Sequence, residues 1–350
     1  MALLGGFLNS HILSLPSFHY HTTILQTTLT TISGVIITHI ATYLSTCLLT
    51  IGSSTASYDP TSRKNLAVYW GQNSAGAPRA HSLGNNGRNF YLHTVLTPDF
   101  DIIILAFIVD MDKVELNFAN QQGVTCDPHS QPVKCDTIAK DIDECKKSGN
   151  TVLLSIGGSG AAFKGYGTQT AASEGAEKIW KMFGPAQSGD DTNRPFGDTF
   201  VDGFNLDLES PVNNVVSFAN RMKALMNGNF ALSAAPECQS PKNAELLKPG
   251  ILDIWFVQFY NNPPCYATGN LGPSLKDWTT WAKGNKTKLF VGLPSSAPAA
   301  PAGGYIAPEK LKENFNTAND LDVLAGAMLW DASQAWANDN YHKKVKEVLI

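Results

Sequence analysis

Short apolar runs rich in β-branched and aromatic residues recur along the chain from residue 65 onward, and polar, helix-compatible stretches separate most of them. Eight runs predict buried strands, at residues 65–71, 100–107, 151–158, 201–209, 230–238, 253–260, 288–294 and 324–330. Segments such as TIAKDIDECKKSG, VVSFANRMKALMNG and APEKLKENFNTAND are compatible with helices. Continuous apolar strands that alternate with helices are typical of a parallel sheet covered on both faces.

The number of these units favours an α/β fold in which the sheet closes on itself as a (β/α)8 TIM barrel. A doubly wound open sheet is the alternative, although no GxGxxG follows the first predicted strand. Residues 58–350 have the length of a single barrel. We therefore expect one barrel domain over this range.

Polar side chains occupy alternate positions in one predicted strand, which reads DGFNLDLE at residues 202–209. Strand side chains alternate between two faces, so Asn205, Asp207 and Glu209 point one way while the intervening apolar residues point the other. Burying carboxylates is costly without partners, so this row is either a satisfied polar network or a working site. In a barrel, catalytic groups gather at the C-terminal ends of the strands, where we place Glu209 as the last strand residue.

Residues 1–57 contain no Lys, Arg, Asp or Glu, and residues 32–51 are apolar enough for a signal sequence or a membrane span. The small-residue patch GSSTAS follows, so we interpret the segment as a secretion leader cleaved near Ala56. A retained membrane anchor and a misplaced start of the gene are the alternatives. The sequon at residues 285–287 agrees with secretion.

The net charge and the spacing of the histidines limit which ligands and partners the protein is expected to bind. The formal net charge is −4 and Lys/Arg runs are absent, which disfavours nucleic acid and favours a neutral substrate. His81, His93 and His129 lie in predicted loops without the spacing of metal ligands, so we assign no metal and no cofactor. We expect a monomer.

Five cysteines follow the leader, and a secreted protein would form two disulfides from them and leave one thiol. Cys126 and Cys135 flank a loop-like segment, and Cys238 and Cys265 each follow a strand-like run. We expect these two pairings, which leave Cys145 free.

Six motifs occur in order, each on its own predicted strand. They are YWGQN (69–73), SIGG (155–158), DGFNLDLE (202–209), SAAPEC (233–238), QFYNNPPC (258–265) and MLW (328–330). From residue 65 to the C-terminus, the chain resembles glycoside hydrolase family 18, specifically the class III endochitinases of fungi and plants. This resemblance implies a retaining hydrolysis of chitin or chitooligosaccharides in which the N-acetyl group of the substrate is the nucleophile.

The resemblance also assigns roles to side chains. Glu209 would protonate the glycosidic oxygen and later activate water, with a pKa raised by Asp207 and by apolar surroundings. Asp207 would hold the acetamido N–H, and Tyr260 would donate its hydroxyl to the acetamido oxygen. Trp330 would form the apolar floor beneath the sugar. The remaining side chains assigned to the substrate-binding site are Asn205, Tyr69, Gln72, Gln258 and Asn261.

Other interpretations remain open for several of these residues. Trp330 and Tyr69 could be plain core, and Gln72, Gln258 and Asn261 could form hydrogen bonds within the barrel mouth. The resemblance further implies cis peptide bonds at Ala106–Phe107 and Trp330–Asp331.

The chain departs from the family pattern DGxDxDxE at one position, because Asn205 stands where the family has aspartate. An amide there can donate a hydrogen bond to Asp207, which would lower the pKa of Asp207 and hold it away from Glu209. We therefore expect a slower enzyme with a shifted pH profile. The leading hypothesis is a secreted chitinase, and the alternative is a chitin-binding barrel with weak or no catalysis; the intact Glu209 favours the enzyme.

Overall fold

A computed structural model describes the chain from residue 58. The described residues are 58–72, 74–75, 92–95, 97–118, 126, 133–159, 161, 163–187, 193–239, 241–265, 271–316, 318 and 321–349. All of them belong to one compact unit, Thr55–Ile350. The expected leader at residues 1–57, as well as His81 and His129, lies outside the described residues. Within the described ranges, no helix combines the length and the apolar character needed to span a bilayer.

Among the described residues, eight parallel strands form a closed sheet, and a ninth short strand is antiparallel to its neighbour. The strands are β1 (Asn65–Trp70), β2 (Ile102–Asp110), β3 (Glu115–Leu116), β4 (Thr151–Gly157), β5 (Gly203–Asp207), β6 (Ala231–Ala234), β7 (Ile254–Gln258), β8 (Lys288–Pro294) and β9 (Leu324–Trp330). The sheet closes because β1 pairs with both β2 and β9. The predicted (β/α)8 barrel is thus confirmed.

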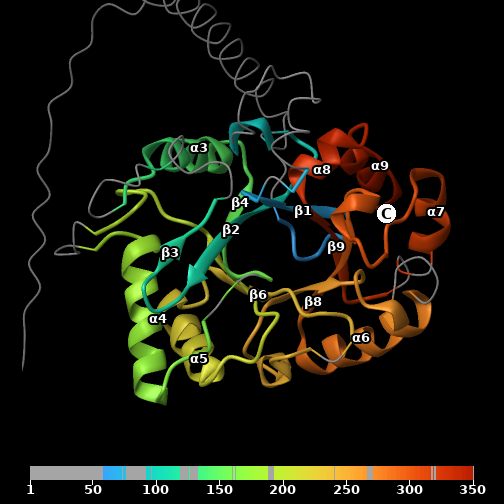
Figure 1. The fold of residues 1–350 in the computed structure, drawn as a ribbon. Helices are drawn as coiled ribbons and strands as arrows, with labels where there is room; N and C mark the ends of the chain where they lie inside the picture. Colours follow the sequence, from blue (N-terminus) through green and yellow to red (C-terminus); the bar gives the residue numbers. More distant parts are fainter. Residues whose placement is uncertain are drawn as a thin grey trace, which may run out of the picture. The chain divides into compact units, whose positions relative to one another are not determined.

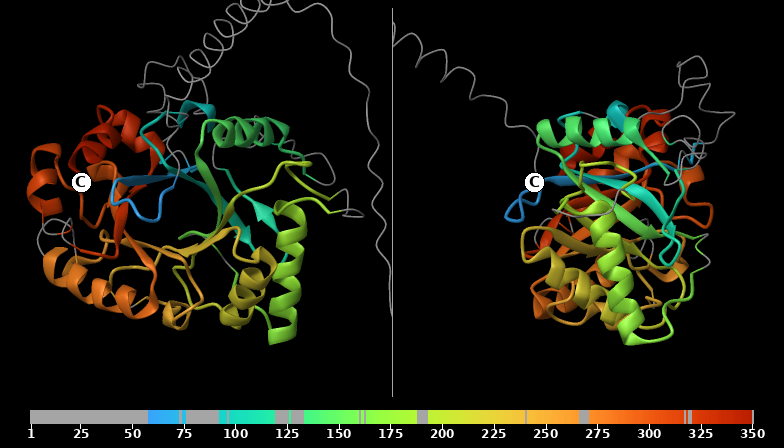
Figure 2. Two further views of the ribbon diagram at one scale, coloured as in Figure 1. Left: turned by 180° about the vertical axis from the view of Figure 1, so that it is seen from behind. Right: turned by 90° about the vertical axis from the view of Figure 1, so that its left-hand side faces the viewer.

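Helices follow most of the strands and surround the barrel (Figure 1). Short 3-10 helices are η2 (Leu92–Val95), η3 (Ala244–Leu247), η4 (Pro263–Cys265) and η5 (Ala297–Ala299). The α-helices are α3 (Asp136–Lys147), α4 (Gln169–Phe183), α5 (Val215–Met226), α6 (Leu271–Asn285), α7 (Pro308–Asn316), α8 (Ala332–Ala337) and α9 (Tyr341–Val348). The turned views show the same outer layer of helices from behind and from the side (Figure 2).

Alternation along each strand divides the core into two layers. In β1, Leu66, Val68 and Trp70 belong to the larger cluster, which includes buried helix residues, whereas Ala67 and Tyr69 belong to a smaller cluster formed mainly by strand residues. The larger cluster is the layer between sheet and helices, and the smaller one fills the barrel. This arrangement explains why the strands read as continuous apolar runs, because both faces of each strand are buried.

The strand limits differ from the prediction at several strands, and the difference at β5 affects the site. The run at residues 201–209 forms a strand only over Gly203–Asp207, so Glu209 lies two residues beyond the strand rather than at its last position. The antiparallel strand β3, which pairs with the end of β2, was not predicted. Its two residues are too short to leave a pattern in the sequence.

The expected covalent and backbone features are present. Cys126 is bonded to Cys135, Cys238 is bonded to Cys265, and Cys145 is a buried free thiol. Burial raises the pKa of Cys145 to about 12, so this thiol stays protonated and unreactive at neutral pH. The peptide bonds Ala106–Phe107 and Trp330–Asp331 are cis.

His342 predicts how stability depends on pH. Its side chain is completely buried and packs against the rings of Phe100 and Trp336, and neither ring nitrogen has a hydrogen-bond partner. Burial lowers the pKa of His342 to about 4, below the value of about 6.5 for an unfolded chain. Between these two values the unfolded chain binds more protons than the folded one, so acid favours unfolding.

We expect His342→Phe to remove this acid sensitivity while keeping an aromatic ring in the stack. The difference in thermal midpoint between the variant and the parent should be nearly constant above pH 7 and should grow in favour of the variant as the pH falls from 6.5 toward 4. Thermal unfolding at half-unit pH steps measures this difference. A difference that does not change with pH would show that His342 does not take up a proton on unfolding.

Candidate active site

The polar row of β5 points into the barrel, as its alternation predicted. Phe204 and Leu206 pack in the layer between sheet and helices, whereas Asn205 and Asp207 are buried polar residues that belong to neither apolar cluster. Glu209 follows two residues after the strand, at the end of the barrel where the parallel strands finish. The row therefore runs from the barrel interior to its mouth.

Asn205 lies deepest and has its polar atoms satisfied by hydroxyl groups. Its amide donates to the hydroxyls of Tyr69 and Ser155, each at 2.8 Å, and its carbonyl accepts from the Ser233 hydroxyl at 3.0 Å. Strand register places Ser155 and Ser233 directly beside it, because β4, β5 and β6 are neighbours. The expected hydrogen bond from Asn205 to Asp207 does not form, because these three hydroxyls occupy the amide.

Asp207 ends the strand, and Gln258 at the end of β7 holds it. The Gln258 amide donates to Asp207 Oδ1 at 2.9 Å and to the Ala235 carbonyl at 2.9 Å. Burial, followed by the charge of Glu209, raises the pKa of Asp207 well above its usual range, and Gln258 opposes this only in part. The expectation of a lowered pKa was wrong, because Asn205 offers Asp207 no hydrogen bond and the site is dry.

A glycine of the SIGG motif lets β4 approach this strand end. Gly157 has φ of 116°, and a Cβ built there would lie 2.1 Å from the Asp207 carbonyl oxygen. No other residue type fits so close to that backbone. The motif thus contributes the Ser155 hydroxyl at one end and this close approach at the other.

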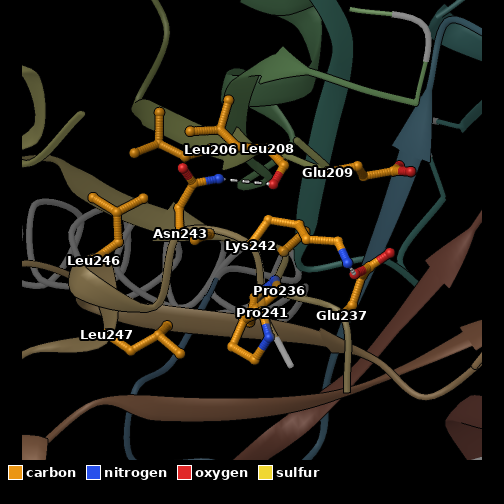
Figure 3. A pocket seen from close by; sticks show the side chains of 12 residues that line it. Leu206, Leu208, Glu209, Pro236, Glu237, Pro241, Lys242, Asn243, Leu246 and Leu247 are labelled. Atoms are coloured by element: carbon orange, nitrogen blue, oxygen red, sulfur yellow. Dashed lines mark hydrogen bonds and ion pairs between the residues drawn. The ribbon is translucent and has the colours of Figure 1, made fainter. Parts of the chain in front are cut away.

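Glu209 separates two hollows at the barrel mouth. One has about 350 Å³ of empty space and is lined also by Glu237, Lys242, Asn243 and apolar side chains (Figure 3). The other, of about 310 Å³, is lined by Asp207 and by residues that follow β2, β4 and β5. Burial raises the pKa of Glu209, and the charge of Glu237 raises it further. The raised pKa was predicted, but Asp207 was expected as the charged neighbour, and Glu237 was not.

Asn243, which the sequence analysis did not select, fixes the backbone on both sides of Glu209. Its amide donates to the carbonyls of Leu208 at 3.0 Å and Ser210 at 2.9 Å, and its own oxygen accepts from the Val212 N–H at 2.8 Å. Figure 3 shows the bond to Leu208 at the edge of the hollow. Asn243 and Leu208 are 35 positions apart in the sequence, and no local sequence pattern predicts their contact.

The aromatic residues selected from the sequence gather at the same mouth. The ring of Trp330 lies 5.3 Å from Tyr69, edge to face, and 6.0 Å from Phe107, nearly parallel. Trp330 is only partly buried, which leaves part of its surface exposed. Tyr260 is buried beside the carboxylates: burial, then Asp207, Glu209 and Asp331, raises its pKa well above the usual value, so its hydroxyl keeps its proton and remains a donor.

Two further candidates have backbone partners in this structure. Gln72 donates to the carbonyls of Ala106 at 3.0 Å and Asn117 at 2.9 Å, and the Asn261 carbonyl accepts from the Ala302 N–H at 3.2 Å. These bonds brace loops at the barrel mouth. Among the described residues, no group of three His, Cys, Asp or Glu side chains could hold a metal ion.

Comparison with known proteins shows the family to which the chain belongs. Residues 65–304 match the glycosyl hydrolases family 18. The chain belongs to this family. It is 34% identical to Endochitinase 33 of Trichoderma harzianum over 88% of this chain and 98% of that protein. It is 35% identical to a class III chitinase of Arthroderma benhamiae over 81% of this chain and 85% of that protein. The class III resemblance is confirmed.

A solved structure that is named for inhibition rather than hydrolysis has a similar fold. The crystal structure of the xylanase and α-amylase inhibitor protein XAIP-II of Scadoxus multiflorus matches this chain with a TM-score of 0.65 at 26% identity, covering 80% of this chain and 97% of that one. The fold alone therefore does not establish catalysis, and the chemistry of this site must be inferred from its own residues. Glu209 has a raised pKa and borders two hollows, Asp207 is buried, and Tyr260 keeps a hydroxyl donor, so these groups are chemically able to take part in general acid catalysis.

Asn243 provides a test of how this family 18 site is held. We expect Asn243→Ala to lower the free energy of unfolding by about 1–3 kcal/mol, because buried backbone groups lose their partners. It should also lower kcat, because the loop that carries Glu209 loses its clamp. Denaturant unfolding and initial rates measure the two effects.

Asn65→Ala is the matched control, because Asn65 is a buried asparagine that makes several hydrogen bonds to backbone, at the opposite end of the barrel. It should lower stability comparably and leave the rate per folded molecule unchanged. Equal losses of rate in both variants would contradict a positioning role for Asn243.

Proposed function

We propose that this protein is a secreted, endo-acting chitinase that hydrolyses β-1,4 linkages between N-acetylglucosamine units, with retention of configuration and assistance from the substrate's N-acetyl group. Membership of glycosyl hydrolases family 18 and the similarity to named chitinases support the reaction class. The single observation that carries the proposal is Glu209, a carboxyl group with a raised pKa that borders two hollows above the buried Asp207.

The first step requires a proton on Glu209. Burial and the repulsion between two neighbouring carboxyl groups disfavour full ionisation of the pair, which favours the retention of one proton. When the acetamido N–H of the substrate hydrogen-bonds to Asp207, the ionised form of Asp207 is favoured and the proton resides on Glu209. Glu209 then donates it to the glycosidic oxygen as the bond between that oxygen and C1 breaks.

The second step uses the substrate's own acetamido oxygen, which attacks C1 and forms an oxazolinium-type intermediate. Asp207 stabilises its positive charge, and the Tyr260 hydroxyl donates to the acetamido oxygen and orients it. Glu209, now ionised, accepts a proton from a water molecule that opens the intermediate. The donor role of Tyr260 agrees with the raised pKa of its hydroxyl.

Substrate binding rests on the aromatic cluster and on polar side chains at the mouth. The exposed part of Trp330 offers an apolar surface beneath a sugar ring, and Tyr69 and Phe107 hold that indole in place. Tyr69, Asn205, Gln72, Gln258 and Asn261 complete the proposed binding site, most of them by holding the reacting groups and loops in position. Hydrolysis of chitin by this mechanism requires neither a metal nor a cofactor.

Secretion and a monomeric catalytic domain over residues 58–350 are part of the proposal. Two disulfides in the described residues agree with an oxidising compartment. The sequon at Asn285 carries less weight, because the Asn285 amide donates to the Leu247 carbonyl at 2.6 Å in the folded protein.

A chitin-binding barrel with weak or no catalysis is the second candidate function. Asn205 supports it, because the amide replaces a carboxylate of the family pattern at the centre of the site. The similarity to an inhibitor protein supports it as well. Glu209 separates the candidates, because a purely binding barrel has no use for a protonated carboxyl at the mouth.

Replacement of the proposed acid tests the function directly. We expect Glu209→Gln to lower the rate of chitooligosaccharide hydrolysis by about 10²–10⁴-fold, because the amide cannot donate the required proton. Ligand affinity should stay within a few-fold. Rates from labelled oligosaccharides and binding calorimetry measure the two quantities. Glu177→Gln, on the outer helix α4, is the matched control. A parent protein that binds these oligosaccharides without cleaving them would establish the binding barrel instead.

Asn205→Asp tests whether the amide limits the rate. The carboxylate would give Asp207 an acidic neighbour with which to share a proton, so we expect a higher kcat. We also expect the thermal midpoint of the variant to fall below that of the parent, by more at neutral pH than at pH 4, because a second buried charge repels Asp207. Rate and midpoint are measured on one preparation from pH 4 to 8. A variant no faster at any pH would show that Asn205 does not limit catalysis.

A further inference from the structure

A third carboxylate, which the mechanism above does not use, faces the same hollow as Glu209. Glu237 follows β6 within the SAAPEC motif, and its side chain is only 21% exposed. Its carboxylate lies 3.7 Å from the ammonium group of Lys242. Figure 3 shows the carboxylates of Glu209 and Glu237 on the same side of the hollow, away from Leu246 and Leu247.

The backbone holds Glu237 firmly beside the end of β7. Gln258 donates its N–H to the Pro236 carbonyl at 2.9 Å, and the Cys238 N–H donates to the Gln258 carbonyl at 3.2 Å. Cys238 is in turn bonded to Cys265, and its carbonyl accepts from the Trp278 indole at 3.1 Å. Glu237 therefore sits in a rigid segment, next to the glutamine that holds Asp207.

We propose that Glu237 is a positioning residue that keeps the catalytic proton on Glu209 by like-charge repulsion, and that Lys242 limits this repulsion by pairing with Glu237. The inference rests on the proposed role of Glu209 as general acid. Glu209 and Glu237 line the same hollow, and repulsion between neighbouring carboxylates favours the protonated form of one of them. The higher pKa that the charge of Glu237 gives Glu209 agrees with this.

Other charged or titratable groups near Glu209 are few. Asp207 comes from β5, Tyr260 follows β7, and Asp331 follows β9 and acts on Tyr260. Among the described residues that line the second hollow, only Asp207 and Glu209 are titratable. Glu237 and Lys242 are thus the charges that can be changed without removing a group from the proposed chemistry.

The neutral side chain of Asn205 makes the charge of Glu237 more important for the carboxyl pair. The family pattern has a carboxylate beneath Asp207, and this chain has a neutral amide whose hydrogen bonds go to hydroxyl groups. The inner end of the polar row therefore contributes no charge to the carboxyl pair. Glu237 supplies a negative charge from the side of the hollow instead.

Two variants distinguish an effect of charge from an effect of structure, because a charge effect shifts the pH profile in opposite directions in the two. Glu237→Gln preserves shape and the backbone bonds of the segment, so it should move the basic limb of the kcat/KM profile to lower pH. Lys242→Gln leaves Glu237 unpaired, so it should move the same limb to higher pH. The position of this limb reports an apparent pKa that belongs to the carboxyl pair of Asp207 and Glu209 rather than to one residue. Shifts in the same direction, or no shift in Glu237→Gln, would overturn the inference.

A direct titration separates this inference from the proposed function. With 13C-labelled glutamate, the carboxyl resonance that disappears in Glu209→Gln identifies Glu209, and its midpoint can be followed in the parent and in both variants. We expect a lower midpoint in Glu237→Gln and a higher one in Lys242→Gln, whether or not the protein hydrolyses chitin. Midpoints that do not move would refute the role of Glu237, and absent hydrolysis with moving midpoints would refute the proposed function alone.

Discussion

Closure of the parallel sheet is the constraint on which the rest of this structure depends. The pairing of β1 with β9, as well as with β2, removes both edges of the eight-stranded sheet and sends all its strands in one direction. Their C-terminal ends must then meet at one mouth. For this reason Tyr69 and Trp330, which lie near opposite ends of the domain sequence, contact each other above the same carboxylates. The barrel thus converts a linear order of motifs into a ring of side chains.

Burial of polar groups changes in character from the interior to the mouth of this barrel. Asn205, the deepest, is neutral and bonded to three hydroxyls, so it costs little stability. Asp207 is also buried but has one side-chain donor, Gln258, and its charged form is disfavoured. Glu209 is partly open and has a raised pKa. Protons are therefore bound by the carboxyl groups near the mouth, where the glycosidic oxygen of a substrate would need one.

Contacts within the loops hold the charged side chains of the mouth close to one another. Asn243 holds the backbone on both sides of Glu209, and the disulfide at Cys238 tethers the segment that carries Glu237. Carboxylates that repel each other would otherwise separate by moving into solvent, which would return their pKa values toward normal. Stability of these loops and acidity at Glu209 are therefore linked through the same contacts. The hydrophobic layer beneath them has no such role, since it only packs sheet against helices.

The sequence by itself determined the barrel, because strands buried on both faces leave continuous apolar runs, and it determined the inward row of β5, because side chains alternate with period two. It also predicted Glu209, Tyr260 and Trp330 at one mouth and both disulfides. Only the tertiary structure decided the partners of Asn205, which depend on the register of β4 and β6. It alone brought Glu237, Lys242 and Asn243 to Glu209. These contacts join residues from 28 to 136 positions apart, and local pattern carries no information about them because loop closure and strand register, not neighbouring residues, set which side chains meet.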